Sequence, residues 1–193
     1  MVTGQQGPLL LVCHANRARS PLAARVLAAR ATELGSRPAT QILSSGLFAN
    51  QGEPLLPEAE RTLRAHGLET DDHAARPFSL AEARASRLVL TFERQQLRRV
   101  VEQDPALLGR TFTLRELLRL ARSRLWEESW NGGPDLAHRL NQLRPRVAAG
   151  DDDIGDPAAV RSRASRHLLE RVVTDTTAAA PVILGPPHSE STP

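Results

Sequence analysis

A short segment near the N-terminus combines residue types that can hold and attack a phosphate-like anion. It begins at Cys13, the only cysteine of the chain, and reaches Arg19 just before Ser20-Pro21. Successive backbone N–H groups in such a turn can point inward, and a helix that begins there adds positive potential. The guanidinium can bind two oxygens of one anion. The same field favours a thiolate at Cys13, which the Ser20 hydroxyl would stabilise further by a hydrogen bond.

The spacing of Cys13 and Arg19 is by itself weak evidence for an anion site. The chain has no lysine, so arginine supplies all 25 basic residues among 193 and often falls at such a distance by chance. A buried cysteine beside a surface arginine is the alternative. The conjunction of strand, cysteine, asparagine, arginine, Ser-Pro and helix favours an anion site.

The elements that would position this turn alternate along the chain. Short apolar runs predict strands at Pro8–Val12, Gln41–Ser44, Leu88–Phe92 and Arg110–Thr113. Amphipathic patterns predict helices from Ser20 to a stop at Gly35, over Pro57–His66 and Glu93–Gln103, from Leu114 to about Trp126, from Asp135 to about Leu143, and over Ala158–Val173. This alternation predicts a single α/β domain, a four-stranded parallel sheet flanked by helices on both faces. Ligands of such sheets bind at the carboxyl ends of strands, where Cys13 lies.

The remaining segments complete the predicted organisation. Residues 1–177 are expected to form the α/β domain, with a helical insertion at about 115–150, and residues 178–193 a loose Pro/Ser-rich tail. Ser20 is expected to cap the first helix, with Pro21 at its first position. Trp126 and Trp130, inside the insertion, are expected to pack rather than clamp a substrate.

The segment from Val12 to Pro21 resembles the phosphate-binding loop of the low-molecular-weight protein tyrosine phosphatases. That family has Val-Cys-x-Gly-Asn-x-Cys-Arg-Ser-Pro, and this chain has Val-Cys-His-Ala-Asn-Arg-Ala-Arg-Ser-Pro. Ser44-Ser45-Gly46 is similar to the family's Ser-Ala-Gly, and His73-Ala74-Ala75-Arg76 to its His-x-x-Arg. Leu88–Phe92 with Glu93 resembles its third strand, and Asp156-Pro157 its late Asp-Pro. The resemblance extends over about residues 8–175.

The resemblance implies a phosphomonoester hydrolase with a phosphocysteine intermediate. Cys13 would be the nucleophile, Arg19 would bind the transferring group and Asp156 would act as general acid and base. The phosphate-binding loop would comprise His14, Ala15, Asn16, Arg17, Ala18 and Arg19. Asn16, Ser20, Ser44 and His73 would support this loop. The resemblance implies no metal and no cofactor.

Two other aspartate sites compete with Asp156 for the role of the acid. Asp104 also precedes a proline, but it follows a helix directly and is expected to end it. Residues 151–153 are three consecutive aspartates that are expected to form a solvated acidic turn. Asp156 comes just before the last predicted helix, where the family keeps its acid.

The chain departs from the family pattern at four places. Ala15 replaces a glycine, at a cost of about 1 kcal/mol if that position needs a positive φ. Ala18 replaces a second cysteine, so an oxidised Cys13 would have no disulfide partner. No tyrosine follows Asp156-Pro157, which leaves Phe48 and Arg17 as candidates for the substrate rim. The fourth difference is the insertion at about 115–150.

A protein tyrosine phosphatase is therefore the function that the sequence favours. Arsenate reduction with an external thiol, dephosphorylation of protein phosphoarginine, and phosphate binding without catalysis remain as alternatives. Arg17 would disfavour the cationic phosphoguanidinium. The expected partners are a phosphorylated protein or a small phosphoester, with inorganic phosphate or sulfate as ligands of the loop.

Composition narrows the remaining classes of function. The net charge is only +3, and the pI of 10.6 reflects the absence of lysine and tyrosine, so we expect no nucleic-acid partner. A single cysteine excludes an intramolecular disulfide. No apolar run reaches the roughly 18 residues of a membrane helix, and no signal sequence is evident. We therefore expect a cytoplasmic protein that does not bind membranes.

Overall fold

Four parallel strands form the centre of the computed structural model, which describes residues 7–34, 41–70, 72–128 and 135–185. The strands are β1 (Leu9–Cys13), β2 (Ile42–Gly46), β3 (Leu88–Thr91) and β4 (Thr111–Thr113), in the order β2-β1-β3-β4. Cys13 pairs with Gly46 at the carboxyl ends of β1 and β2. The predicted four-stranded parallel sheet is confirmed, with strand ends shifted by one or two residues.

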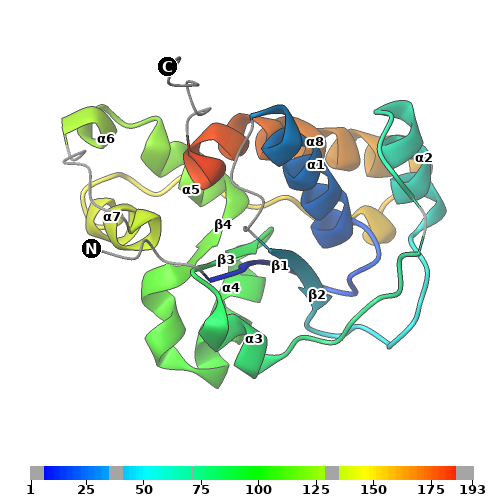
Figure 1. The fold of residues 1–193 in the computed structure, drawn as a ribbon, viewed down its shortest axis with the longest axis horizontal. Helices are drawn as coiled ribbons and strands as arrows, with labels where there is room; N and C mark the ends of the chain where they lie inside the picture. Colours follow the sequence, from blue (N-terminus) through cyan, green and yellow to red (C-terminus); the bar gives the residue numbers. More distant parts are fainter. Residues whose placement is uncertain (1–6, 35–40, 71, 129–134, 186–193) are drawn as a thin grey trace, which may run out of the picture.

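The sheet separates two apolar layers, because successive residues of β1 face opposite sides. Leu9, Leu11 and Cys13 belong to the larger layer, and Leu10 and Val12 to the smaller one. The larger layer packs against α1 (Arg19–Glu33), α2 (Pro57–Ala65), α5 (Leu114–Ala121), α7 (Leu136–Leu143) and α8 (Ser162–Leu184). The smaller layer packs against α3 (Leu80–Ala85) and α4 (Arg94–Gln103), on the opposite face of the sheet (Figure 1). Helices on both faces were predicted and are confirmed.

The first helix begins two residues earlier than the predicted cap at Ser20 and first position at Pro21 imply. Helix α1 starts at Arg19, and its N-cap residue is Ala18, whose side chain cannot cap. The prediction of Ser20 as the cap is therefore wrong, because Ser20 lies inside the first turn with its hydroxyl directed to the loop. The expected stop at Gly35 lies outside the described residues.

The C-terminal helix is longer and later than predicted. A short 3-10 turn, η2 (Pro157–Ala159), precedes α8, which continues through Pro181 to Leu184. Ala179, Ala180 and Ile183 are buried in the larger layer. The prediction of a loose tail from residue 178 is therefore wrong as far as residue 184, because these apolar side chains gain more from burial than the segment loses by ordering.

The described part of the region predicted as a helical insertion contains three short helices. The expected helix 114–126 is interrupted at Arg122-Ser123, so that α5 is followed by a separate α6 (Arg124–Glu128). Trp126 packs against the larger layer, as predicted, and the guanidinium carbon of Arg139 lies 3.5 Å from the centre of its ring. Trp130 lies outside the described residues.

Two further short elements were not predicted. These are α3 and a 3-10 helix, η1 (Pro105–Arg110), which links α4 to β4. Among the described residues, no helix has the length and apolarity needed to cross a membrane. In the same part of the chain, no group of three or more His, Cys, Asp or Glu side chains could hold a metal ion.

Candidate phosphate-binding site

The loop between β1 and α1 is organised around Asn16. Its backbone adopts the left-handed conformation, with φ of 55°, and its side chain is buried. The amide nitrogen donates to the hydroxyls of Ser20, at 2.9 Å, and Ser44, at 3.0 Å. The amide oxygen accepts from the backbone N–H of Arg76 at 2.9 Å. Asn16 thus fixes the loop through its side chain, as predicted, and asparagine tolerates the left-handed region better than most residues.

Ala15 is not strained in this loop. Among the described non-glycine residues, positive φ occurs at Asn16 and Asp72 but not at Ala15. The conditional cost that the sequence suggested for alanine at this position therefore does not arise.

The nucleophile candidate lies at the base of the loop. Cys13 ends β1, is 2% exposed, and has its Sγ 3.0 Å from the hydroxyl oxygen of Ser20. The Ser20 hydroxyl also contacts the carbonyl oxygen of Ser45 at 3.2 Å. A hydroxyl at this distance can stabilise a thiolate, which is the role that the sequence predicted for Ser20.

Gly46 lets β2 approach the loop closely. A Cβ atom at this position would lie 2.6 Å from the backbone nitrogen of Asn16 and 2.8 Å from the carbonyl oxygen of His14. Both neighbours are backbone atoms, which cannot move aside as a side chain can. A side chain here would push the anion loop out of position.

The imidazole of His73 contacts the backbone of the loop. Its Nε2 lies 2.7 Å from the carbonyl oxygen of Asn16, which agrees with the supporting role predicted for it. Burial lowers the pKa of His73 from its ordinary value of 6.5, although the hydrogen bond with Asn16 acts in the opposite direction. The neutral imidazole is therefore the form that the fold favours.

The N-terminus of α1 is open toward the loop. No side chain caps it, and its first turn contains no acidic residue. The free N–H groups and the positive end of a 15-residue helix are consequently available to an anion. Arg19 is the first residue of this helix.

Arg19 is buried and held by three acceptors. Its exposure is 1%, and its Nη1 donates to the Glu93 carboxylate and, at 2.9 Å, to the carbonyl oxygen of Ile154. Its Nη2 lies 3.1 Å from Oδ2 of Asp156. The structure thus brings the two proposed catalytic residues Arg19 and Asp156 into contact, although 137 positions separate them in the chain.

The segment that carries Asp156 is attached to the end of β3. The backbone N–H of Ile154 donates to the carbonyl oxygen of Phe92 at 2.7 Å. The other carboxylate oxygen of Asp156 accepts the N–H of Ala158 at 3.0 Å, which orients the side chain at the start of η2. Asp156 is about one-third exposed, so a reacting group in the loop can reach it.

The competing aspartates have other positions. Asp104 ends α4, caps η1 and pairs with Arg84 at 2.7 Å, which confirms its predicted turn role. Asp152 is buried, with 4% exposure, and pairs with Arg94 and Arg119. The prediction of a solvated turn is therefore wrong for Asp152, because two guanidinium groups replace its water.

Glu93 is the site residue to which the sequence assigned no role. It follows β3 directly and contacts both Arg19 and the side-chain amide of Gln96, the latter at 2.8 Å. The sequence shows an acidic residue directly after a predicted strand. Its contact with Arg19 follows only from the strand order, which places β3 next to β1.

The rim differs from the expectation for Arg17. Its Nε donates to the carbonyl oxygen of Pro54 at 2.8 Å, and its Nη1 lies 3.6 Å from the Glu53 carboxylate. Arg17 is therefore partly neutralised and tied to the neighbouring loop. Phe48 is 58% exposed, and its ring centre lies 4.8 Å from that of His14. These two rings form an aromatic wall beside the loop.

The loop lies at the carboxyl end of β1 in a parallel sheet, begins at a cysteine and ends at an arginine. This arrangement is typical of cysteine-dependent phosphatases. Residues 8–129 match the family model of low molecular weight phosphotyrosine protein phosphatases. The chain belongs to this family, whose members are cysteine-dependent phosphatases.

Curated relatives agree with this assignment. The chain is 33% identical over 102 residues to the low molecular weight protein-tyrosine-phosphatase Wzb of Escherichia coli, covering 53% of this chain and 65% of that protein. It is 28% identical over 109 residues to the probable low molecular weight protein-tyrosine-phosphatase EpsP of Ralstonia nicotianae, covering 56% of this chain and 71% of that protein.

Solved structures show the same fold. The YwlE arginine phosphatase from Geobacillus stearothermophilus has a TM-score of 0.67 and 22% identity, covering 92% of each chain. The tyrosine phosphatase Wzb from Escherichia coli in complex with sulphate has a TM-score of 0.64 and 20% identity, covering 92% of this chain and 98% of that one.

Proposed function

We propose that this protein hydrolyses phosphomonoesters of phosphorylated proteins, with Cys13, Arg19 and Asp156 as its catalytic residues. The observation that carries the proposal is the contact of Asp156 with buried Arg19, at the end of a loop that begins at Cys13. Membership of the phosphatase family favours hydrolysis over arsenate reduction and over phosphate binding without catalysis.

The first half-reaction transfers the phosphoryl group to sulfur. The Cys13 thiolate attacks phosphorus, and the bond between phosphorus and the leaving oxygen breaks on the opposite side. Protonated Asp156 gives its proton to that oxygen. Arg19 and the N–H groups of the loop bind the equatorial oxygens, where charge spreads in the transition state.

The second half-reaction restores the thiolate. A water molecule attacks phosphorus, Asp156 takes its proton, and the bond between phosphorus and the sulfur of Cys13 breaks to release inorganic phosphate. An arriving phosphate group competes with Asp156 for Arg19, which would free the carboxyl group for these proton transfers. The sulphate bound by the structurally similar Wzb supports a tetrahedral dianion as the ligand of this loop.

The rim supports an aromatic phosphoester as the substrate. Phe48 and His14 provide an apolar wall on which the ring of a phosphotyrosine would pack. They would take the place of the tyrosines that are absent after Pro157. Proteins that carry phosphotyrosine are the substrates that we propose on this basis.

Hydrolysis of an aryl phosphate by matched variants tests the mechanism. We expect Cys13→Ser to abolish turnover and Asp156→Asn to lower kcat by about 10²–10⁴-fold, the usual contribution of acid–base catalysis. Asp104→Asn is the matched control, because Asp104 also precedes a proline but caps η1 instead. Equal kcat for wild type and Cys13→Ser would contradict the nucleophile, and equal losses in the two aspartate variants would contradict the acid.

A further inference from the structure

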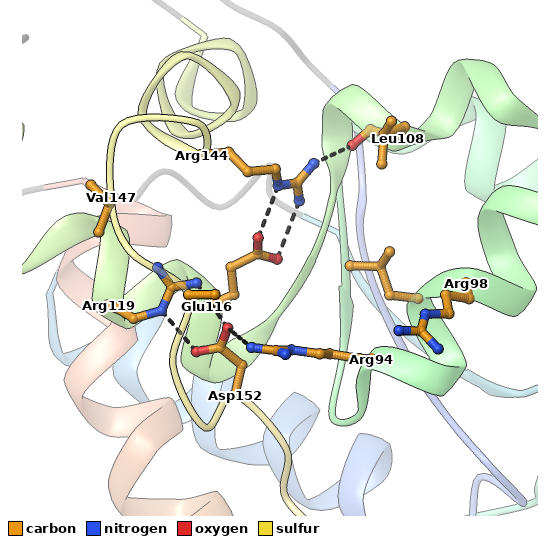
Figure 2. A pocket seen from close by; sticks show the side chains of 10 residues that line it. Arg94, Arg98, Leu108, Glu116, Arg119, Arg144, Val147 and Asp152 are labelled. Atoms are coloured by element: carbon orange, nitrogen blue, oxygen red, sulfur yellow. Dashed lines mark hydrogen bonds and ion pairs between the residues drawn. The ribbon is translucent and has the colours of Figure 1, made fainter.

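A cavity of about 300 Å³ lies between α4 and the chain around residues 144–152 (Figure 2). Its apolar lining comes from Leu97, Leu108, Val147 and Ala149. No residue of the 13–19 loop lines it, and neither does Asp156. The volume is at the lower end of the range for small-molecule sites, which suits a ligand with one ring.

Two of the four arginines around this cavity have their charge matched. Arg144 binds the Glu116 carboxylate through Nε at 2.8 Å and Nη2 at 3.2 Å. Arg119 binds the Asp152 carboxylate through Nε at 2.9 Å and Nη2 at 2.8 Å. Figure 2 shows these two pairs on the side of the cavity opposite Arg98. Glu116 and Asp152 are the carboxylates that line the cavity, and each already pairs with one of these arginines.

The other two arginines lie one turn apart on α4. Arg94 shares the Asp152 carboxylate with Arg119, through Nη2 at 3.1 Å, and its backbone N–H donates to Asp153. Its Nε and Nη1 have no acceptor in the described part of the chain. Arg98 is exposed and, within the same residues, forms no hydrogen bond or ion pair. Like charges at this spacing disfavour a helix unless an anion lies between them.

We propose that this cavity is a second ligand site, which binds a small aromatic anion through Arg94 and Arg98. The anionic group would accept from the free N–H groups of the two guanidiniums, which suit a carboxylate, phosphonate or phosphate. The ring would lie between the apolar side chains of the lining, with Leu97 on one side and Val147 on the other. Asp152 and Glu116 keep their own arginines, so binding needs no ion pair to break.

Titration calorimetry with phenylphosphonate tests this site in the full chain. We expect two binding events in wild type, one in the Cys13–Arg19 loop and one in the cavity. Arg98→Glu should weaken the second event by at least about tenfold, because it replaces a charged donor by a repelling carboxylate. Arg99→Glu is the matched control: Arg99 lies next to Arg98 on α4 but pairs with Glu102 and does not line the cavity.

Inhibition of aryl phosphate hydrolysis reports the loop separately. Phenylphosphonate should compete with substrate equally well in wild type, Arg98→Glu and Arg99→Glu. A single binding event in wild type, or a second event that survives in Arg98→Glu, would overturn the proposed cavity site. Absence of hydrolysis would instead contradict the proposed function. The calorimetric comparison of the variants would still test the cavity site.

Discussion

The charge of Arg19 illustrates how single residues of this site depend on partners from distant segments. The acceptors of its guanidinium belong to Glu93, Ile154 and Asp156, which all come much later in the chain. A buried guanidinium without such partners would be strongly destabilising. We therefore expect Glu93 to act as a positioning residue for Arg19, whose guanidinium we propose binds phosphate.

Glu93→Gln tests this positioning at the residue scale. The variant keeps the shape but removes the charge of the acceptor, so we expect kcat for an aryl phosphate to fall by about tenfold, the loss of one charge-assisted hydrogen bond. Steady-state kinetics measures the effect, and urea unfolding monitors the fold. Glu102→Gln, at an exposed ion pair of α4, should change neither. A kcat equal to that of wild type would show that Glu93 does not position Arg19.

At the scale of elements, ion pairs tie the segment between residues 150 and 156 to its neighbours. Asp152 holds Arg94 of α4 and Arg119 of α5, and thus joins two helices to the segment that ends in Asp156. Burial alone would raise the pKa of Asp152, but the hydrogen bonds and charges of Arg119 and Arg94 outweigh it and hold the pKa below its ordinary value of 3.8. The ionised carboxylate is therefore the form that stabilises the fold.

Asp152→Asn should destabilise the protein by about 1.5–3 kcal/mol near neutral pH, the range for hydrogen bonds to charged groups. The contribution of Asp152 is complete above its unfolded pKa of about 3.8 and is lost as the pH falls through the lower pKa of the folded state. Urea unfolding between pH 3 and pH 7 should accordingly show a smaller acid dependence in the variant. Asp151→Asn, at a side chain that is 83% exposed, is the control. Equal effects of the two substitutions would contradict a special role of Asp152.

The elements also show how much of the secondary structure the sequence patterns predict. The strands and most helices were predicted from apolar runs and amphipathic periodicity, because these patterns record which face is buried. The end of α8 was not, since Ala179 and Ala180 are small residues next to prolines and resemble a tail. They are buried because α8 packs along α1 and α5, which sequence periodicity alone does not reveal.

The molecule as a whole has few groups that titrate between neutral and strongly alkaline pH. The chain contains neither lysine nor tyrosine, whose side chains titrate in that range. His73 binds its proton less readily in the folded state because burial lowers its pKa. Its stabilising contribution is therefore present above its unfolded pKa of 6.5 and is lost as the pH falls through the lower folded value.

We therefore expect the free energy of unfolding to decrease as the pH falls below about 6.5. Urea unfolding between pH 5 and 7.5 measures this decrease. His73→Gln should reduce the decrease below pH 6.5, whereas His138→Gln, at an exposed position, should leave it unchanged. A decrease that is identical in wild type and His73→Gln would exclude His73 as its source.

The sequence by itself determined the order of the loop residues and the class of fold. Residues 13–21 are contiguous, so the order of cysteine, asparagine, arginine, serine and proline is visible without any folding, and the strands are recognisable from local apolar runs. Only the tertiary structure decided which carboxylates face Arg19, that Asp152 is buried while Asp151 is exposed, and that Arg17 is tied to Glu53. The physical reason is that contacts between distant segments depend on strand order and helix packing, whereas a phosphate-binding loop is made by neighbours in the chain.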